Sequence, residues 1–194
     1  MLILGSQSPR RKEILEFFSL PFRQISSSFD EDSIPFAGNP VTYASTLAKG
    51  KALSLQERYP NDLILTADTI VFKGGELYSK PLSEEAGFEM LKAFNGKWHT
   101  VYTSVCAAQE KNIAIEVEET QVLFHQLNEG QLKAYHKAFK GEDKAGGYGI
   151  QMGGSIIIKR IEGCFYNVMG LPITATRNVL LKMGIDLWEY LNLS

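Results

Sequence analysis

The chain has 194 residues, of which 44% are apolar and 11% aromatic, so it is long and apolar enough to bury a substantial core. This composition excludes a disordered chain and fits one large domain or two small lobes that share a cleft. The formal net charge of −2 argues against a general affinity for nucleic acid or an anionic membrane, so any site for a polyanion must be local.

The N-terminal stretch predicts a short buried strand over residues 2–4, a tight turn of small residues and an abrupt helix start. Ser8 suits the N-cap of this helix, and Pro9 suits its first position, where a missing N–H group is harmless. Apolar residues at positions 14, 15, 17 and 18 predict one buried stripe.

Three cations, Arg10, Arg11 and Lys12, occupy the first turn of that helix. They lie at the positive end of the helix dipole, where each cation is disfavoured by about 0.3–1 kcal/mol. The pattern suits an anion such as a phosphate chain. The backbone N–H groups at the helix start, with Ser8 beside them, and the guanidinium groups would bind it. The alternative is that the three side chains extend into water and bind nothing.

A second strand is predicted over 21–25, followed by a serine-rich and then acidic loop over 26–32. Asn39-Pro40 repeats the cap-and-proline start and predicts a helix over 41–59. Lys51 lies beside the apolar stripe of this helix, so its ammonium either reaches solvent or points into a pocket.

A continuous apolar run over 63–72 predicts a central strand that is covered on both faces. Asp68 lies inside this run. An ionised carboxylate there is unfavourable unless it is paired, hydrogen-bonded or metal-bound, so Asp68 is a candidate functional residue. The alternative is a carboxylate that accepts hydrogen bonds from nearby backbone donors.

The rest of the chain alternates strands and helices, with one glycine-rich segment over 142–151 that is either a flexible loop or a close approach to a ligand. Alternating apolar residues at 113, 115 and 117, and later at 122 and 124, predict half-buried antiparallel strands. The predicted elements are a hairpin at Gly74-Gly75 returning over 76–78, a helix from Ser83 to Asn95, strands over 99–108 and 113–127, a helix over 129–139, strands over 155–161 and 164–169, and a helix over 173–183.

The two cysteines, Cys106 and Cys164, have no CxxC partner and lie in strand-like runs, so we expect buried free thiols rather than a disulfide or a zinc site. The three histidines lack metal-ligand spacing, and no P-loop or nucleophile-elbow motif occurs. The chain has no basic segment followed by a long apolar one at its start, and no apolar run approaches 18 residues. We therefore expect a cytoplasmic protein.

Several polar residues do not suit the elements that carry them. Together they are the types of residue that a site for a metal-bound polyphosphate requires. Carboxylates are the hard ligands that Mg²⁺ prefers, and cations neutralise phosphate charge on a leaving pyrophosphate. A carboxylate beside the metal can deprotonate a water, and a side-chain amide can bind a base edge. The set is Arg10, Arg11, Glu31, Lys51, Asp68, Lys80 and Gln151.

Six ordered motifs over nearly the whole chain resemble those of the Maf family of nucleoside triphosphate pyrophosphatases. The motifs are Ser6-Gln7-Ser8-Pro9-Arg10-Arg11, Leu47-Ala48-Lys49-Gly50-Lys51-Ala52, Ala67-Asp68-Thr69-Ile70-Val71, Lys80-Pro81, Asp143-Lys144-Ala145-Gly146-Gly147-Tyr148-Gly149-Ile150-Gln151 and Val168-Met169-Gly170-Leu171-Pro172. The resemblance implies an α/β fold related to inosine triphosphatase, with a twisted mixed β-sheet flanked by helices. It also implies a single domain over 1–194, whose two lobes surround a central active-site cleft.

The same resemblance implies hydrolysis between the α and β phosphates, with Mg²⁺ or Mn²⁺, by a homodimer. The Arg-Arg pair, Thr69 and the Gly-Ile-Gln ending resemble the branch that acts on dTTP and UTP. The implied roles are Asp68 as base, Glu31 and Asp68 at the metal, Arg11, Lys51 and Lys80 at the phosphates, and Arg10, Thr69 and Gln151 in substrate choice. The alternative function is a nucleotide- or nucleic-acid-binding regulator of septum formation, with incidental catalysis.

Overall fold

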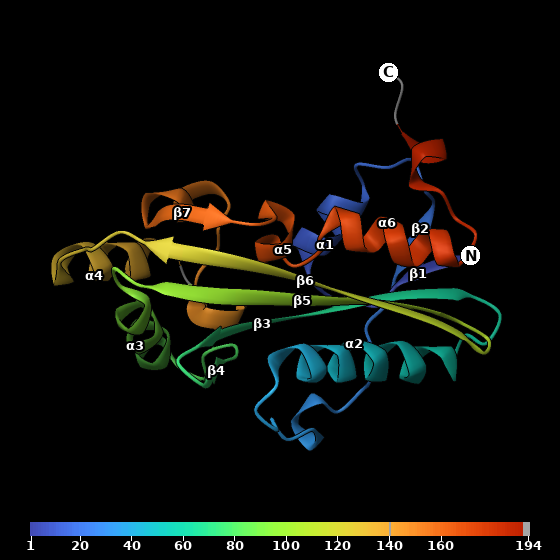
Figure 1. The fold of residues 1–194 in the computed structure, drawn as a ribbon, viewed down its shortest axis with the longest axis horizontal. Helices are drawn as coiled ribbons and strands as arrows, with labels where there is room; N and C mark the ends of the chain where they lie inside the picture. Colours follow the sequence, from blue (N-terminus) through green and yellow to red (C-terminus); the bar gives the residue numbers. More distant parts are fainter. Residues whose placement is uncertain (140, 192–194) are drawn as a thin grey trace. The chain divides into compact units, whose positions relative to one another are not determined.

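The structure is a computed structural model that describes residues 1–139 and 141–191, and Figure 1 shows its strands and helices along the chain. The strands are β1 (Leu2–Leu4), β2 (Phe22–Gln24), β3 (Leu63–Lys73), β4 (Glu76–Tyr78), β5 (Trp98–Gln109), β6 (Asn112–Phe124) and β7 (Ile158–Glu162). The α-helices are α1 (Pro9–Leu15), α2 (Pro40–Gln56), α3 (Glu84–Phe94), α4 (Glu129–Ala138), α5 (Phe165–Met169) and α6 (Ile173–Lys182). Single 3₁₀ turns cover Glu31–Ser33, Ala145–Gly147, Met152–Ile156 and Leu187–Tyr190.

The strands form one mixed sheet, in the order β2-β1-β3-β5-β6-β7 with β4 paired to β3. Strand β1 pairs in parallel with β2 and with β3, whereas the pairs β3–β4 and β6–β7 are antiparallel. The predicted α/β fold, with a mixed sheet and helices, is therefore confirmed. Across the described ranges, every helix is too short or too polar to span a bilayer.

The chain divides into two compact units. Unit 1 comprises Met1–Asp68, Thr103–Glu118 and the chain from Gly170 onward, and unit 2 comprises Thr69–Tyr102 and Glu119–Met169. The chain passes between the units within β3, β5 and β6, and again between α5 and α6. The predicted cleft between two lobes stays a prediction.

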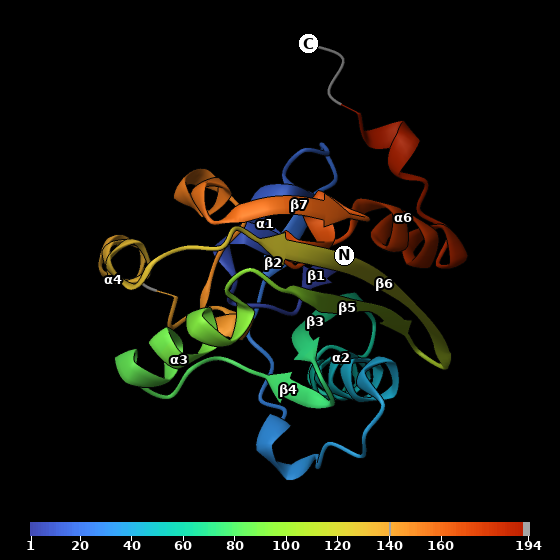
Figure 2. The ribbon, with the colours of Figure 1, turned by 60° about the vertical axis from the view of Figure 1, so that its left-hand side comes forward.

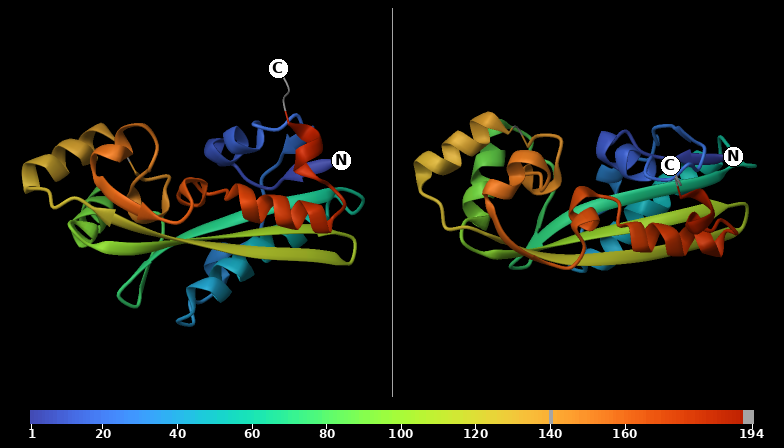
Figure 3. Two further views of the ribbon diagram at one scale, coloured as in Figure 1. Left: turned by 45° about the horizontal axis from the view of Figure 1, so that its top comes forward. Right: turned by 90° about the horizontal axis from the view of Figure 1, so that it is seen from above.

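Unit 1 packs helix α2 against its strands through a buried apolar face that includes two alanines. Ala48, Ala52 and Leu55 of α2 lie in one buried cluster with strand residues that include Ile3 and Ile64. Figures 1 and 3 show α2 on one side of these strands and α6 on the other. Asn39 caps α2 as predicted, since its side chain accepts a hydrogen bond from the Thr42 N–H at 2.9 Å.

Unit 2 has an aromatic core, and Figure 2 shows helices α3 and α4 side by side at its edge. The His99 ring stacks on Phe94 with 4.3 Å between centroids, and its Nε2 shares a 2.7 Å hydrogen bond with the Tyr148 hydroxyl. Burial, with a smaller effect from Lys73, lowers the pKa of His99 to about 3, so this imidazole is neutral. His99 therefore has a structural role in this core, which agrees with the lack of metal-ligand spacing among the histidines.

The strand predicted over 164–169 is wrong, because these residues form the short helix α5. The Thr120 hydroxyl holds the start of this helix: it accepts from the Cys164 N–H at 2.9 Å and donates to the Cys164 carbonyl at 3.2 Å. Buried Asn167 donates to the same hydroxyl and to the Val101 carbonyl. Cys164 is accordingly half-buried rather than buried, whereas Cys106 is buried as predicted.

Three smaller predictions on strands and helices also need correction. Phe17 is 44% exposed because α1 ends at Leu15, before the predicted stripe is complete. Ile113 is 40% exposed, and the buried side of β6 carries Ala114, although Val122 and Phe124 are buried as predicted. The strand predicted to begin at residue 155 begins at Ile158, after a 3₁₀ turn.

Candidate functional site

The turn between β1 and α1 positions Arg11 in unit 1. The Ser8 side chain caps α1 by accepting from the Arg11 backbone N–H, and Pro9 follows it, as predicted. The Ser6 hydroxyl accepts from the Ser8 N–H at 3.1 Å and from Arg11 Nη1 at 3.2 Å. Arg11 Nε donates to the Gly170 carbonyl at 2.8 Å. Two partners therefore fix the plane of this guanidinium, and the alternative that the first-turn cations extend into water and bind nothing does not hold for Arg11.

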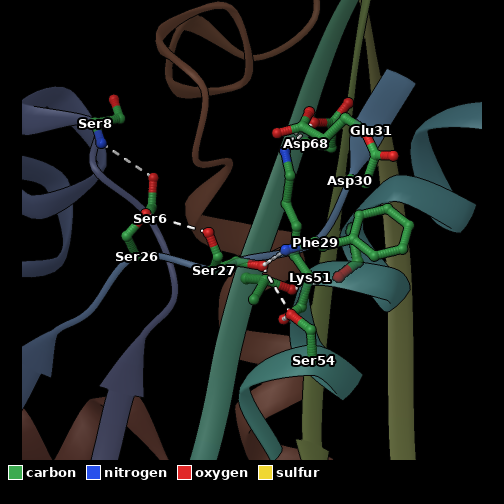
Figure 4. Close-up of polar contacts among 12 residues, drawn as sticks. Ser6, Ser8, Ser26, Ser27, Phe29, Asp30, Glu31, Lys51, Ser54 and Asp68 are labelled. Carbon is green, nitrogen blue, oxygen red and sulfur yellow. Dashed lines mark hydrogen bonds and ion pairs between the residues drawn. The ribbon is translucent and has the colours of Figure 1, made fainter. Parts of the chain in front are cut away.

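Lys51 lies between two carboxylates, as Figure 4 shows. Its Nζ is 2.6 Å from Asp68 Oδ1 and 2.8 Å from Glu31 Oε2. The Lys51 side chain is 11% exposed and that of Asp68 is 8% exposed, whereas Glu31 is 48% exposed. The choice left open by the sequence is thus decided: the ammonium points inward, to the carboxylates.

Strand β3 meets helix α2 through two polar contacts on one strand face. The buried Thr66 hydroxyl donates to the Ala48 carbonyl at 2.7 Å. Asp68, two residues later and therefore on the same face, meets Lys51, three residues later on the helix. The apolar run on β3 thus carries its carboxylate directly over the lysine of α2.

Burial and charge oppose one another at Asp68. Burial raises the pKa of the Asp68 carboxyl, while the Lys51 ammonium and then the Arg11 guanidinium lower it and Glu31 raises it. Burial also lowers the pKa of Arg11, and the charge of Asp68 opposes that shift. A buried carboxylate that is surrounded by cations suits a proton acceptor near an anionic substrate.

The acidic loop over 26–32 is held against α2, which places Glu31 beside Lys51. Ser27 and Ser54 share a hydrogen bond of 2.9 Å between their hydroxyls, and the Phe29 N–H donates to the Ser27 hydroxyl at 3.0 Å. The Phe29 ring covers Gly50, so closely that a Cβ built on Gly50 would lie 2.3 Å from the ring. The three neighbouring acidic residues are Asp30, Glu31 and Asp32. Of these, Glu31 forms the ion pair with Lys51 by which we locate the site.

Sequence reasoning missed Phe29, Ser27 and Gly50 as supports of this site. A signal for Gly50 did exist, because a glycine inside a helix destabilises it by about 1 kcal/mol relative to alanine and needs a packing reason. Ser6 was also missed as the acceptor for Arg11, since only the fold shows that its hydroxyl faces the guanidinium.

The carboxylates of Glu31 and Asp68 suit a divalent cation. Their oxygens already converge on one positive charge, the Lys51 ammonium, at ordinary hydrogen-bond distances. No cluster of three or more His, Cys, Asp or Glu side chains fit to hold a metal occurs among the described residues. Mg²⁺ commonly uses only one or two carboxylates and takes its other ligands from water and phosphate, so this donor set fits it.

The other predicted site residues are placed as follows. Arg10 is partly buried in the first turn of α1 in unit 1. Thr69 follows Asp68 on β3 and is half-buried, Lys80 is exposed after β4, and Gln151 precedes a 3₁₀ turn, all three in unit 2. Gln151 Oε1 is buried and has no hydrogen-bond partner among the described residues. That these four side chains meet Asp68 around one substrate stays a prediction.

Comparison with known proteins gives consistent matches over nearly the whole chain. The model of the family described as "Maf-like protein" matches residues 1–183. A dTTP/UTP pyrophosphatase of Chlamydia caviae is 49% identical over 98% of this chain and 97% of its own. A nucleoside triphosphate pyrophosphatase of Chlamydia muridarum is 44% identical over the same shares. A dTTP/UTP pyrophosphatase of Clostridium perfringens is 41% identical over 96% of this chain and 98% of its own.

One solved structure, the Ham1 protein of Staphylococcus aureus, aligns with 98% of this chain and 93% of its own, at 11% identity and a TM-score of 0.46. A likeness at this level is too low to support a conclusion about function.

Proposed function

Because the chain belongs to the Maf-like protein family, we propose that it is a nucleoside triphosphate pyrophosphatase that hydrolyses dTTP and UTP to the monophosphate and pyrophosphate. The observation that carries this proposal is the buried Asp68 carboxylate, which shares the Lys51 ammonium with Glu31. Relatives at 41–49% identity over nearly the full chain are named for this activity. The hydrogen bonds of Arg11 and the ion pairs of Lys51 with Asp68 and Glu31 support the proposal, because they hold charged groups of the kind that such a reaction uses.

In the proposed reaction, a water attacks the α-phosphorus in line with the bond to the leaving pyrophosphate, and Asp68 accepts the proton of that water. Arg11, Lys51 and Lys80 bind the phosphates and stabilise the charge that develops on the leaving group. The hydrogen bonds of Arg11 to Ser6 and Gly170 hold its guanidinium in a fixed orientation, which lowers the entropy lost on binding.

The proposed cofactor is Mg²⁺ or Mn²⁺, held by Glu31 and Asp68. When bound, the ion would supply positive charge to the phosphates and lower the pKa of a bound water. The convergence of both carboxylates on the Lys51 ammonium supports this assignment, because the same place stabilises a cation.

Arg10, Thr69 and Gln151 are proposed to set the choice of nucleotide, with the Ser8 cap and the first turn of α1 facing the phosphates. The buried and unpaired Oε1 of Gln151 supports a role in binding, because an acceptor in such a place gains from a donor such as the N3–H of uracil or thymine. A cytoplasmic homodimer is part of the same proposal, and the two free cysteines suit a reducing compartment.

The test is an assay of the purified protein with Mg²⁺ and a panel of nucleoside triphosphates in ¹⁸O-labelled water. We expect pyrophosphate as product, the label in the monophosphate, and the highest kcat/KM for dTTP and UTP. Asp68→Asn should lose at least about a thousandfold in kcat. The matched change Asp62→Asn, at a carboxylate that pairs with the N-terminal ammonium, should leave kcat as in the wild type. Release of orthophosphate, or full activity of Asp68→Asn, would refute the proposal.

A further inference from the structure

We propose that the Lys51 ammonium holds the place of the metal ion until a triphosphate arrives, so that nucleotide binding opens the metal site. The inference rests on the proposed function, because it takes Glu31 and Asp68 as the metal carboxylates. It gives Lys51 a second role besides binding phosphate, and it makes the bound metal depend on the bound nucleotide.

The geometry supports a shared place for the two cations. Lys51 Nζ lies 2.6 Å from Asp68 Oδ1 and 2.8 Å from Glu31 Oε2, so it uses one oxygen of each carboxylate that a metal would need. Figure 4 shows the lysine side chain rising from α2 with its ammonium at these oxygens. Because Lys51 is only 11% exposed, its ammonium has little water to which it can turn.

The charges support an exchange rather than joint occupation. Two carboxylates carry two negative charges, which Lys51 and the nearby Arg11 already offset. The ammonium would repel a divalent ion that bound beside it. It would also occupy one oxygen of each carboxylate, and the ion would need these two oxygens as ligands. The ion binds well only after the ammonium leaves the carboxylates.

A triphosphate offers the ammonium a new partner, because its oxygens carry several negative charges. Once Lys51 binds a phosphate, both carboxylates are released and need a cation. The metal ion and the triphosphate both bind better when Lys51 has left the carboxylates. By thermodynamic reciprocity, each of the two ligands therefore increases the affinity for the other, and they bind cooperatively. The protein without nucleotide then binds divalent ions weakly.

The experiment measures Mn²⁺ binding to the protein without nucleotide, by electron paramagnetic resonance of the free ion and by calorimetry. We expect Lys51→Met and Lys51→Gln to bind Mn²⁺ at least about tenfold more tightly than the wild type, within the usual range of coupling between sites. Lys49→Met, a matched change of an exposed lysine on the same helix, should bind as the wild type does. Equal or weaker binding by both folded Lys51 variants would overturn the inference.

Two further measurements separate this inference from the proposed function and keep it testable if neutral variants fold poorly. Adding Asp68→Asn or Glu31→Gln to Lys51→Met should abolish the gain in Mn²⁺ affinity; if it does not, the proposed metal site itself is wrong. In the wild type, saturating Mg²⁺ should increase the acetylation rate of Lys51 relative to Lys49, measured by peptide mass spectrometry. An unchanged ratio at saturation would show that the metal does not displace the ammonium.

Discussion

Gly50→Ala tests whether the packing of the Phe29 ring on α2 determines the position of the Glu31 carboxylate beside Lys51. A methyl group at Gly50 would lie 2.3 Å from the Phe29 ring, so the ring must move by roughly 1 Å to reach an ordinary carbon–carbon separation of about 3.5 Å. Phe29 precedes Glu31 by two residues in the same loop, and Ser27 ties that loop to α2. The displacement should therefore reach the carboxylate that pairs with Lys51.

The effects of Gly50→Ala on stability and on activity should differ. Alanine gains about 1 kcal/mol over glycine inside a helix, and overpacking costs about 1–3 kcal/mol, so the free energy of unfolding should fall by no more than about 2 kcal/mol. A misplacement near 1 Å at a reacting group can lower the rate about a hundredfold, and we expect kcat/KM for dTTP to fall about 10- to 100-fold.

The assay combines urea unfolding with steady-state kinetics of the same preparation. The double variant Phe29→Ala, Gly50→Ala is the control for the clash, because it removes the ring. If Gly50→Ala keeps wild-type kcat/KM while its stability changes, then the position of Phe29 does not govern the site, and the reasoning fails.

Three further predictions follow from the contacts of single residues. Because burial raises the pKa of Asp68, kcat/KM should fall on the acidic side with a midpoint above the ordinary value of about 4 for aspartate; a pH profile with a midpoint below 4 would contradict this. Because burial lowers the pKa of His99 from 6.5 to about 3, the unfolded chain binds the extra proton as pH falls below 6.5, and stability is lost in that direction. Urea unfolding should show a loss of about 2 kcal/mol between pH 7 and pH 5 that is absent in His99→Phe. Arg11→Lys should lower kcat/KM about 10- to 100-fold at nearly unchanged Tm, because an ammonium cannot reproduce both the Nε contact to Gly170 and the Nη1 contact to Ser6; an unchanged rate would show that charge alone suffices.

Local chemistry made much of the fold predictable. Ser8-Pro9 and Asn39-Pro40 mark helix starts, because a side-chain cap followed by proline suits few other conformations, and both caps form as predicted. The strand over 63–73 was recognisable from its unbroken apolar character. These signals act within a few residues, so a single sequence contains them completely.

The segment over 164–169 shows where local reasoning fails. Its apolar residues suit a strand, yet Thr120, more than forty residues earlier, supplies the hydroxyl that holds the first turn of α5. The site shows the same limit: an aspartate in an apolar strand was visibly unusual, but its pairing with Lys51 depends on how β3 packs on α2. Residue types were predictable, and their partners were not.

The Arg11–Gly170 hydrogen bond joins residues that are 159 positions apart, so it also bears on the order in which the protein is made. A ribosome therefore releases the helix that bears Arg11 well before it adds Gly170 to the chain. During that interval the nascent chain has its arginine without this acceptor, whatever structure its first strands have reached. The orientation of Arg11 is therefore completed only after Gly170 has been added, so a chain that lacks Gly170 should hold this guanidinium less firmly.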